Sequence, residues 1–398
     1  MKILQICHKP PFPPVDGGTI AMNNVTGGLI KNGNKVKVIS VNTFKHPLNV
    51  AALPEDYISK TQIETVFVDT RLRYSAAFLN LFSGQSYHVS RFYSKVFENK
   101  ISEVLNQEEF DIVLLESLFV TPYIGTIKKN SRAKIVYRAH NIEYEIWKKI
   151  ALGEKNFFKK FYLGLLSEKL KKYEFLIFNK VDGICSISTE DLKKMLEAGC
   201  VVPVETVNFG IDFSDYAFSH SGPVKLNLFF IASFDWLPNL QGLNWFLNSV
   251  WEIAIKKNPD VKLVIAGKSM SGEFSSRCIK NTLIIGEVEN AVKFMSENGI
   301  MIVPLLSGSG IRVKIIEAMA IGKVIIATSV AVKGIHCRNM ENILIADTPE
   351  EFANHIHLAI TDSELRKKIS ANARKFAVEN FDNQILIKKL VAFFKRIQ

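Results

Sequence analysis

A glycine-rich segment in the second half of the chain carries the residue types that bind an anion. It reads Ser307-Gly-Ser-Gly-Ile-Arg-Val-Lys-Ile-Ile-Glu317, follows a buried apolar run and opens a predicted helix. Gly308 and Gly310 allow the backbone to approach a ligand closely. Ser309 and Ile311 lie in the same turn. The free N–H groups of the helix start, at the positive end of its dipole, would then face the ligand.

Three charged side chains in this segment extend the prediction. Arg312 and Lys314 fall in the first helical turn, where the helix dipole disfavours a cation by a few tenths of a kcal/mol, so a bound anion would relieve the conflict. Glu317 can accept hydrogen bonds from two hydroxyls, as acidic residues of Rossmann sites do for ribose. The structural alternative is a tight turn with Lys314 paired to Glu317 on the helix surface. The spacing fits neither a Walker A loop nor GxGxxG.

Two segments of the first half are weaker candidates. Gly17 and Gly18 stand between a predicted strand and a predicted helix, where open α/β sheets bind ligands. A purely structural Gly-Gly turn is the alternative. His140 follows an apolar strand and could exchange a proton or a hydrogen bond with a substrate. A structural histidine is the alternative there.

These segments require strands to position them. Short apolar runs predict buried strands in the first half at Lys2–Cys7, Lys35–Val41, Ile112–Leu115, Ile135–Tyr137, Gly183–Ser186 and Val204–Val207, with a helix at Thr19–Lys31. The pattern restarts after the turn-rich stretch Ser214–Pro223. Strands are predicted there at Leu226–Ile231, Lys262–Ala266, Leu283–Ile285, Gly299–Val303 and Val324–Ala327, and helices at Leu240–Lys256, Glu289–Ser296 and Arg312–Ile321. Such alternation, seen twice, predicts two α/β domains with parallel sheets.

The predicted domain boundary lies in the turn-rich stretch. It gives an N-terminal domain of residues 1–215 and a C-terminal domain of residues 216–379. A last helix within 380–398 carries Leu386, Leu390 and Phe393 on one face. We expect this face to pack back on the N-terminal domain.

Composition sets the class of protein. The chain has 398 residues, 47% of them hydrophobic, and a net charge of +11 from 50 basic and 39 acidic residues. A packed core and anionic partners are expected, whereas no finger spacing or basic repeat supports nucleic acid. Five scattered cysteines, the absence of a signal-peptide pattern and the absence of a long charge-free apolar run predict a cytoplasmic protein without a transmembrane helix.

One lysine-rich helix is open to two interpretations. Its apolar residues are Phe157, Phe158, Phe161, Tyr162, Leu165, Leu166, Leu170 and Tyr173, flanked by six lysines between residues 155 and 172. The expected role is a helix that packs on the core with a solvated lysine face. The alternative is peripheral contact with an anionic membrane.

The motifs together resemble glycosyltransferase family 4, the group 1 glycosyl transferases with the GT-B fold. The resemblance spans nearly the whole chain. It depends on Gly17-Gly18, His140–Glu143, Val207–Asp212, Phe230–Asn239 and Gly308–Ala320. It implies two Rossmann-like domains facing across a cleft, with the acceptor bound by the first domain and the nucleotide-sugar by the second.

The resemblance also implies an activity. It is a retaining, hexosyltransferase-like transfer from a nucleotide-sugar donor to a glycan or lipid-linked acceptor in polysaccharide or glycoconjugate biosynthesis. No cofactor is implied and no metal, since this fold usually needs none and the chain has no Asp-x-Asp motif. The implied catalytic residues are His140, Arg312 and Lys314. The implied donor-binding residues are Gly17, Gly18, Gly308, Ser309, Gly310, Ile311, Arg312, Lys314 and Glu317. The implied place is the cytoplasm, with peripheral contact at the inner membrane face as an alternative.

Two departures from the family pattern keep other activities open. Family members carry two glutamates eight positions apart, and Ser309 stands at the first position here. They also often carry Arg and Lys in the loop after the first strand of the second domain, and Ala232–Gly242 has neither. Arg312 and Lys314 could supply this missing charge. The alternatives are a nucleotide-sugar epimerase or phosphorylase on the same fold, and a non-catalytic sugar-nucleotide-binding subunit.

Overall fold

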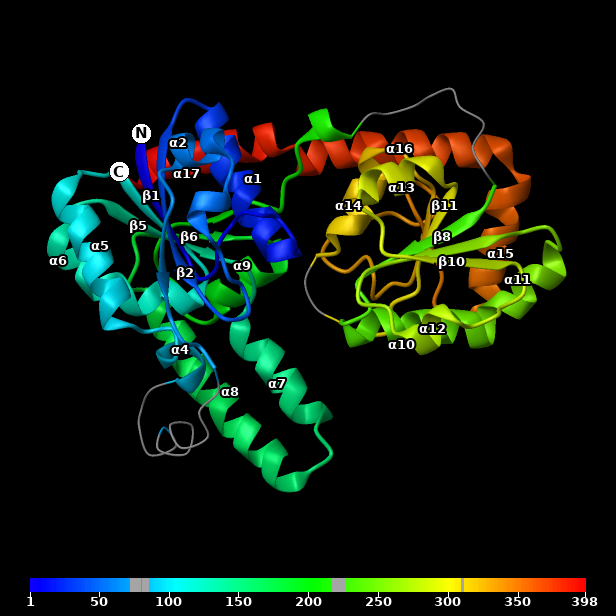
Figure 1. Ribbon diagram of the computed structural model, residues 1–398, viewed down its shortest axis with the longest axis horizontal. Coiled ribbons are helices and arrows are strands. Elements are labelled where there is room, and N and C mark those ends of the chain that lie inside the picture. The colour runs from blue at the N-terminus through cyan, green and yellow to red at the C-terminus, as the bar shows by residue number, and fades with distance from the viewer. Residues whose placement is uncertain (72–79, 81–85, 217–225, 309–310) are drawn as a thin grey trace. The chain divides into compact units, whose positions relative to one another are not determined.

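The chain forms two compact units in a computed structural model (Figure 1). Residues 1–71, 80, 86–216, 226–308 and 311–398 are described by the structure. Unit 1 comprises Met1–Gly210 and Asn383–Gln398, and unit 2 comprises Ile211–Asp382. Unit 1 is therefore built from two stretches of chain, and its second stretch follows unit 2 in the sequence.

Unit 1 contains a seven-stranded parallel sheet in the order β3-β2-β1-β4-β5-β6-β7. Its central strands are buried on both faces and mostly apolar, as is typical of a parallel sheet covered by helices. The strands are β1 (Lys2–Cys7), β2 (Lys35–Asn42), β3 (Glu64–Phe67), β4 (Ile112–Glu116), β5 (Lys134–Ala139), β6 (Gly183–Ser186) and β7 (Val204–Thr206).

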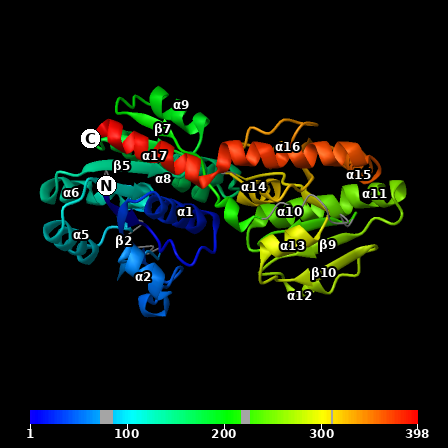
Figure 2. The same ribbon diagram turned by 90° about the horizontal axis from the view of Figure 1, so that it is seen from above.

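Helices cover both faces of this sheet. The described helices are α1 (Gly17–Lys31), α2 (Glu55–Thr61), α4 (Tyr87–Ser90), α5 (Lys95–Gln107), α6 (Ile124–Asn130), α7 (Glu143–Gly153), α8 (Phe157–Phe178), α9 (Thr189–Glu197) and α17 (Asn383–Ile397), with 3₁₀ turns η1 (Val50–Ala52) and η2 (Leu118–Tyr123). One core includes side chains of α1 and α17, and the other includes side chains of α5, α6 and α8. Figure 2 shows these helices from above.

Helix α17 lies close to α1 and β6 because glycines face it. A Cβ at Gly28 would meet Ile387 Cγ1 at 2.5 Å, and one at Gly183 would meet Phe393 at 2.8 Å. Asn383 Nδ2 also donates to Asn24 O at 2.7 Å. The α17 side chains that complete this core are Leu386, Ile387, Leu390, Phe393 and Phe394.

Unit 2 contains a six-stranded parallel sheet in the order β10-β9-β8-β11-β12-β13. Its strands are β8 (Leu228–Ile231), β9 (Leu263–Ala266), β10 (Thr282–Gly286), β11 (Ile300–Val303), β12 (Ile325–Ala327) and β13 (Leu344–Ile345). Its described helices are α10 (Leu237–Trp245), α11 (Trp251–Lys257), α12 (Gly272–Ser275), α13 (Ala291–Glu297), α14 (Val313–Ala320), α15 (Pro349–Thr361) and α16 (Ser363–Phe381), with η3 (Phe213–Asp215) and a π-helical turn, η4 (Phe246–Val250).

The two parallel α/β units confirm the predicted fold class. Each predicted strand has an observed counterpart, whereas the edge strands β3 and β13 were not predicted. The predicted helix Leu240–Lys256 is a continuous rod made of α10, the π-helical turn and α11. Among the described residues, no helix is long and apolar enough to cross a membrane.

Candidate functional site

The strand order of each sheet marks where a ligand would bind. In unit 2 the order reverses between β8 and β11, and in unit 1 it reverses between β1 and β4. Open α/β sheets bind ligands outside the carboxyl ends of the strands at such a switch point. The glycine-rich segment follows β11, and Gly17-Gly18 follows β1, so both candidate segments lie at a switch point.

Lys314 connects the glycine-rich segment to the end of β8. Its Nζ donates to Ile231 O at 3.2 Å and to Asn239 Oδ1 at 3.3 Å, and lies 5.1 Å from the Phe230 ring centroid. Burial, with a smaller contribution from the charge of Arg312, lowers the pKa of Lys314 to about 7. The ammonium is therefore held by two neutral oxygens, in a place where a negative charge would stabilise it.

Arg312 lies at the N-cap position of α14 and makes no side-chain cap there. Its guanidinium lies 5.1 Å from the ring centroid of Trp236, in the loop after β8. Burial lowers the pKa of Arg312 to about 10, which leaves it charged at neutral pH. Gly308 permits this arrangement, because its φ is +128° and a Cβ there would meet Arg312 Nη2 at 2.6 Å.

Glu317 lies one turn further along α14. Tyr216 donates from its hydroxyl to Glu317 Oε1 at 2.9 Å. Burial raises the pKa of Glu317, and the Tyr216 hydrogen bond partly offsets this. Lys314 and Glu317 thus each bind other partners and do not form the Lys314–Glu317 surface pair that the sequence left open as a structural alternative.

The structure brings Gly308, Arg312 and Lys314 to the β8–β11 switch point. Ile311 precedes Arg312 in the sequence and is half-buried. Its side chain lies next to Gly334, where an added Cβ would be 3.5 Å from Ile311 Cγ1. Ser309 and Gly310, also predicted to bind the donor, lie outside the described residues. Trp236, Asn239 and Tyr216 were not predicted as site residues, although Trp236 and Asn239 lie in the stretch Phe230–Asn239 that contributed to the family resemblance.

In unit 1, His140 belongs to a buried polar cluster at the carboxyl end of β4 and β5. Its Nε2 lies 2.7 Å from Glu116 Oε2, which also accepts from Arg138 Nη1 at 3.0 Å. Gln5 Nε2 donates to the other Glu116 oxygen at 2.9 Å, and His8 Nδ1 lies 2.9 Å from Glu116 O. Glu116 and Arg138 are almost fully buried, whereas His140 is 13% exposed.

The protonation states of this cluster follow from its contacts. Burial alone would raise the pKa of Glu116, but Arg138 and His140 outweigh it and hold that pKa at about 2. Burial lowers the pKa of His140 and holds that of His8 at about 3. Since a carboxylate only accepts, neutral His140 must donate from Nε2. Its Nδ1 is then left as a hydrogen-bond acceptor.

Gly17 and Gly18 lie in the first turn of α1, where Asp16 forms a capping box with Thr19. Lys9 Nζ is bound by both Asp16 carboxylate oxygens, at 2.8 and 2.7 Å. A Cβ at Gly18 would lie 3.1 Å from Lys9 Nζ. The glycine therefore leaves room for a cation at this helix start.

Glu116, Arg138, His8 and Lys9 were not predicted. The sequence carried only a partial signal, because Glu116 and Arg138 each follow an apolar run near a strand end. Their pairing in the register of β4 and β5, which places them next to His140, is seen only in the structure.

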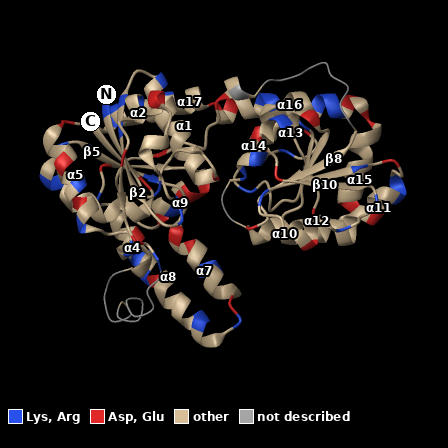
Figure 3. Cartoon of the chain, in the orientation of Figure 1, with Lys and Arg blue, Asp and Glu red and all other residues tan. Residues whose placement is uncertain are grey.

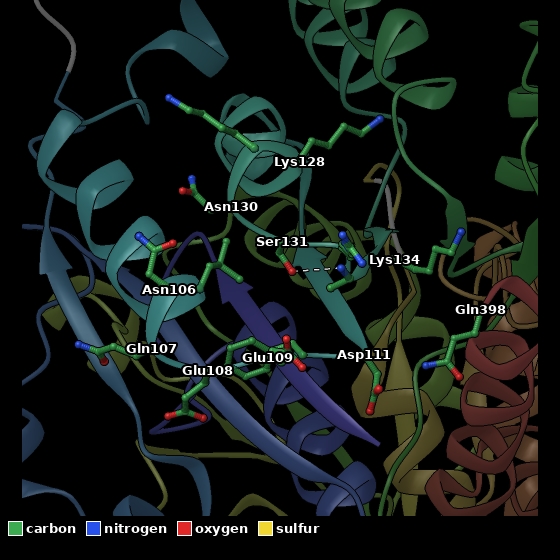
Figure 4. A pocket seen from close by; sticks show the side chains of 15 residues that line it. Asn106, Gln107, Glu108, Glu109, Asp111, Lys128, Asn130, Ser131, Lys134 and Gln398 are labelled. Carbon is green, nitrogen blue, oxygen red and sulfur yellow. Dashed lines mark hydrogen bonds between the residues drawn. The ribbon is translucent and has the colours of Figure 1, made fainter.

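A polar pocket of unit 1 lies elsewhere. It is lined by residues that include Glu108, Asp111, Lys128 and Lys134 (Figure 4). Asp111 precedes β4 and Lys134 begins β5, so the pocket lies at the amino ends of the strands, away from His140. Among the residues that the structure describes, no three His, Cys, Asp or Glu side chains gather as metal ligands.

Comparison with known proteins finds a family match over part of the chain and a similar protein over nearly its whole length. The family model Glycosyl transferases group 1 matches residues 225–362. A 44.6 kDa protein in the cps region of Klebsiella pneumoniae is 25% identical over 396 residues, covering 96% of this chain and 97% of that protein.

Solved structures of low sequence identity share the architecture. HepE from Anabaena in complex with UDP has a TM-score of 0.65 at 14% identity, and the match covers 100% of each chain. Sucrose-phosphate synthase from Thermosynechococcus elongatus has a TM-score of 0.70 at 12% identity, covering 100% of this chain and 99% of that one. Residues 225–362 therefore resemble the group 1 glycosyl transferases, and the chain as a whole has the GT-B fold.

Proposed function

We propose that this chain is a nucleotide-sugar-dependent glycosyltransferase whose unit 2 binds the donor. Lys314 carries the proposal, because a buried ammonium between two neutral oxygens needs an anion to hold its charge. Arg312 adds a second cation beside it. Together they replace the basic residues that are absent from the loop after β8, and they suit a diphosphate.

The proposed chemistry is transfer of a hexosyl group with retention of anomeric configuration. As the glycosidic bond to the diphosphate breaks, negative charge grows on the leaving oxygens. Arg312, Lys314 and the N–H groups at the start of α14 are fixed in place and would stabilise that charge. Two fixed cations can do the work of a bound metal, so we propose metal-independent transfer. Glu317 is the proposed acceptor for ribose hydroxyls.

Unit 1 is proposed to bind the acceptor. Glu116 and Arg138 hold the His140 ring, and the free lone pair on Nδ1 can accept a hydrogen bond from a sugar hydroxyl. Gly17 and Gly18 stand at the start of α1 beside the Lys9 ammonium, which Asp16 holds, and we propose that this helix start contacts a polar group of a ligand.

The known relatives support the class of donor and the setting. HepE was solved with UDP and with UDP-glucose, which favours UDP-sugars as the first donors to test. The Klebsiella relative lies in a cps region, which favours polysaccharide biosynthesis and a glycan or lipid-linked acceptor.

A thermal-shift panel of nucleotide sugars tests the proposal. A donor present at a concentration 100 times its Kd raises the free energy of unfolding by about 2.7 kcal/mol. The specific donor should therefore give the largest rise in melting temperature. Product analysis with that donor then separates the alternatives. Sugar transferred to an added acceptor supports the proposal, whereas an epimerised or phosphorolysed sugar identifies one of the other enzymes. Donor binding without any turnover over a broad acceptor panel would identify a binding subunit.

A further inference from the structure

Helices α7 and α8 form a hairpin that extends away from the sheet of unit 1 (Figure 1). Only residues 154–156 join them, and the Asn156 side chain caps α8 by accepting from Lys159 N at 3.0 Å. This hairpin is the lysine-rich segment for which the sequence left two roles open. The exposure of its apolar residues decides between them.

The base of the hairpin is firmly anchored. Glu174 is buried and accepts from the backbone N–H groups of Glu143 and Tyr144, at 2.9 and 3.0 Å. Ser167 Oγ donates to Tyr144 O at 3.0 Å. Leu170 is buried in the core beneath α8. The second half of α8 therefore packs on the core as expected, and it holds the hairpin in a fixed direction.

The far end of the hairpin is different. Phe157, Phe158 and Phe161 are 75%, 81% and 64% exposed, and Leu152 at the end of α7 is 63% exposed. The expectation that these phenylalanines pack on the core was wrong. Together with Ile150, they form what we call the tip surface. The surface of a monomeric soluble protein rarely exposes so many large apolar side chains together unless another protein or a membrane covers them.

Charge identifies the partner. Residues 148–161 contain five lysines, Lys148, Lys149, Lys155, Lys159 and Lys160, against the single acidic residue Glu154 (Figure 3). A second copy of the chain would bring the same positive charge against this tip. An anionic lipid surface instead attracts the ammonium groups while its acyl region accepts the phenylalanines. Lysine stems can lie along the apolar layer with their charged ends at the headgroups.

We propose that the α7–α8 tip docks this protein onto an anionic lipid surface. The phenylalanines enter the boundary between headgroups and acyl chains, and the surrounding lysines bind headgroup phosphates. Docking of this kind does not depend on the proposed transferase activity, and it needs no helix that crosses the bilayer.

Co-sedimentation of the full chain with vesicles tests the proposal. Vesicles of equal parts phosphatidylglycerol and phosphatidylcholine should bind the protein at low salt, and phosphatidylcholine vesicles should bind it much more weakly. Phe157→Ser combined with Phe158→Ser should lower partitioning at least tenfold. Lys155→Gln combined with Lys160→Gln should lower it about 25-fold, since one lysine near such a surface contributes about fivefold, whereas Arg at both positions should restore it.

A matched variant controls for loss of exposed aromatic area. Phe44 and Phe67 are exposed elsewhere in unit 1, with ring centroids 4.8 Å apart. Phe44→Ser combined with Phe67→Ser should partition like the wild type. Circular dichroism and the melting temperature would verify that all variants fold.

Three outcomes would overturn the proposal. The first is absence of binding to anionic vesicles at low salt. The second is partitioning that the tip and control pairs of substitutions change equally. The third is a dimer in sedimentation velocity that only the tip variant dissociates, because the tip surface would then be a contact between copies.

Discussion

Lys314 gives the sharpest test of the proposed donor site, because its charge depends on what lies beside it. In the free protein, burial lowers its pKa from 10.5 to about 7. A diphosphate next to the ammonium would raise that pKa again. Above pH 7, binding must therefore be accompanied by uptake of a proton.

The size of this effect follows from linkage. With a free pKa of about 7, Lys314 is about 90% neutral at pH 8, so binding of UDP should take up about 0.9 proton. The Kd should rise by up to about tenfold for each pH unit above 7, until the pKa of the bound state is reached. The last proton of a phosphate group leaves near pH 6 and contributes little at pH 8.

Isothermal titration of UDP at pH 8 measures the proton uptake directly, in two buffers with different heats of ionisation. Lys314→Arg keeps a charge that does not titrate, and Lys314→Ala has none, so both should show no proton uptake. Lys314→Ala should also weaken UDP binding by about 1.5–3 kcal/mol, the range for a charge-assisted hydrogen bond. Uridine, which has no diphosphate, should bind all three proteins alike.

Stability gives an independent check with a defined sign. The folded pKa lies below the unfolded one, so the cost of charging Lys314 is complete below pH 7 and is relieved as pH rises towards 10.5. Between pH 7 and pH 9 the wild type should therefore gain about 2–3 kcal/mol relative to Lys314→Met in urea unfolding. No proton uptake at pH 8, together with unchanged UDP affinity in Lys314→Ala, would refute the whole argument.

Three further predictions concern the proposed reaction. Arg312→Ala should weaken UDP binding by about 1.5–3 kcal/mol without changing uridine binding, and calorimetry showing equal loss for both ligands would contradict a diphosphate contact. Transfer should continue in excess EDTA, and a complete loss that magnesium or manganese restores would contradict metal independence. His140→Ala should lower kcat about 10²–10³-fold with little change in donor Kd, the range for removing one group that stabilises transition-state charge, and an unchanged kcat in a folded variant would return His140 to a structural role.

The fold could be predicted from sequence because its central strands are buried on both faces. In Lys2–Cys7, for example, every residue after Lys2 is buried and only Gln5 among them is polar, a pattern that depends little on tertiary context. Edge strands lack that signal. In β3 the residues are at most half-buried, and β13 has only the two residues Leu344–Ile345.

The proposed donor segment could be singled out from sequence because all its parts lie within the eleven residues Ser307–Glu317. The cluster around His140 was not, since Glu116 lies 24 positions earlier in the chain and reaches His140 only through the pairing of β4 with β5. The role of the α8 phenylalanines was also beyond reach. An apolar stripe looks the same in sequence whether a protein core or a lipid layer covers it. Phe157 is exposed and Leu170 is buried because the hairpin extends beyond the sheet, and the sequence does not show how far it extends.

The late return of the chain into unit 1 has a consequence for biosynthesis. Until α17 has been made, the face of the first sheet that receives Leu390 and Phe393 stays open to water, with the hollows at Gly28 and Gly183 unfilled. Unit 2 is continuous in sequence from Ile211 to Asp382, so the ribosome completes it before unit 1 has its last helix. The first domain to emerge is therefore the last to be finished, and it stays exposed to chaperones and proteases throughout the synthesis of the second.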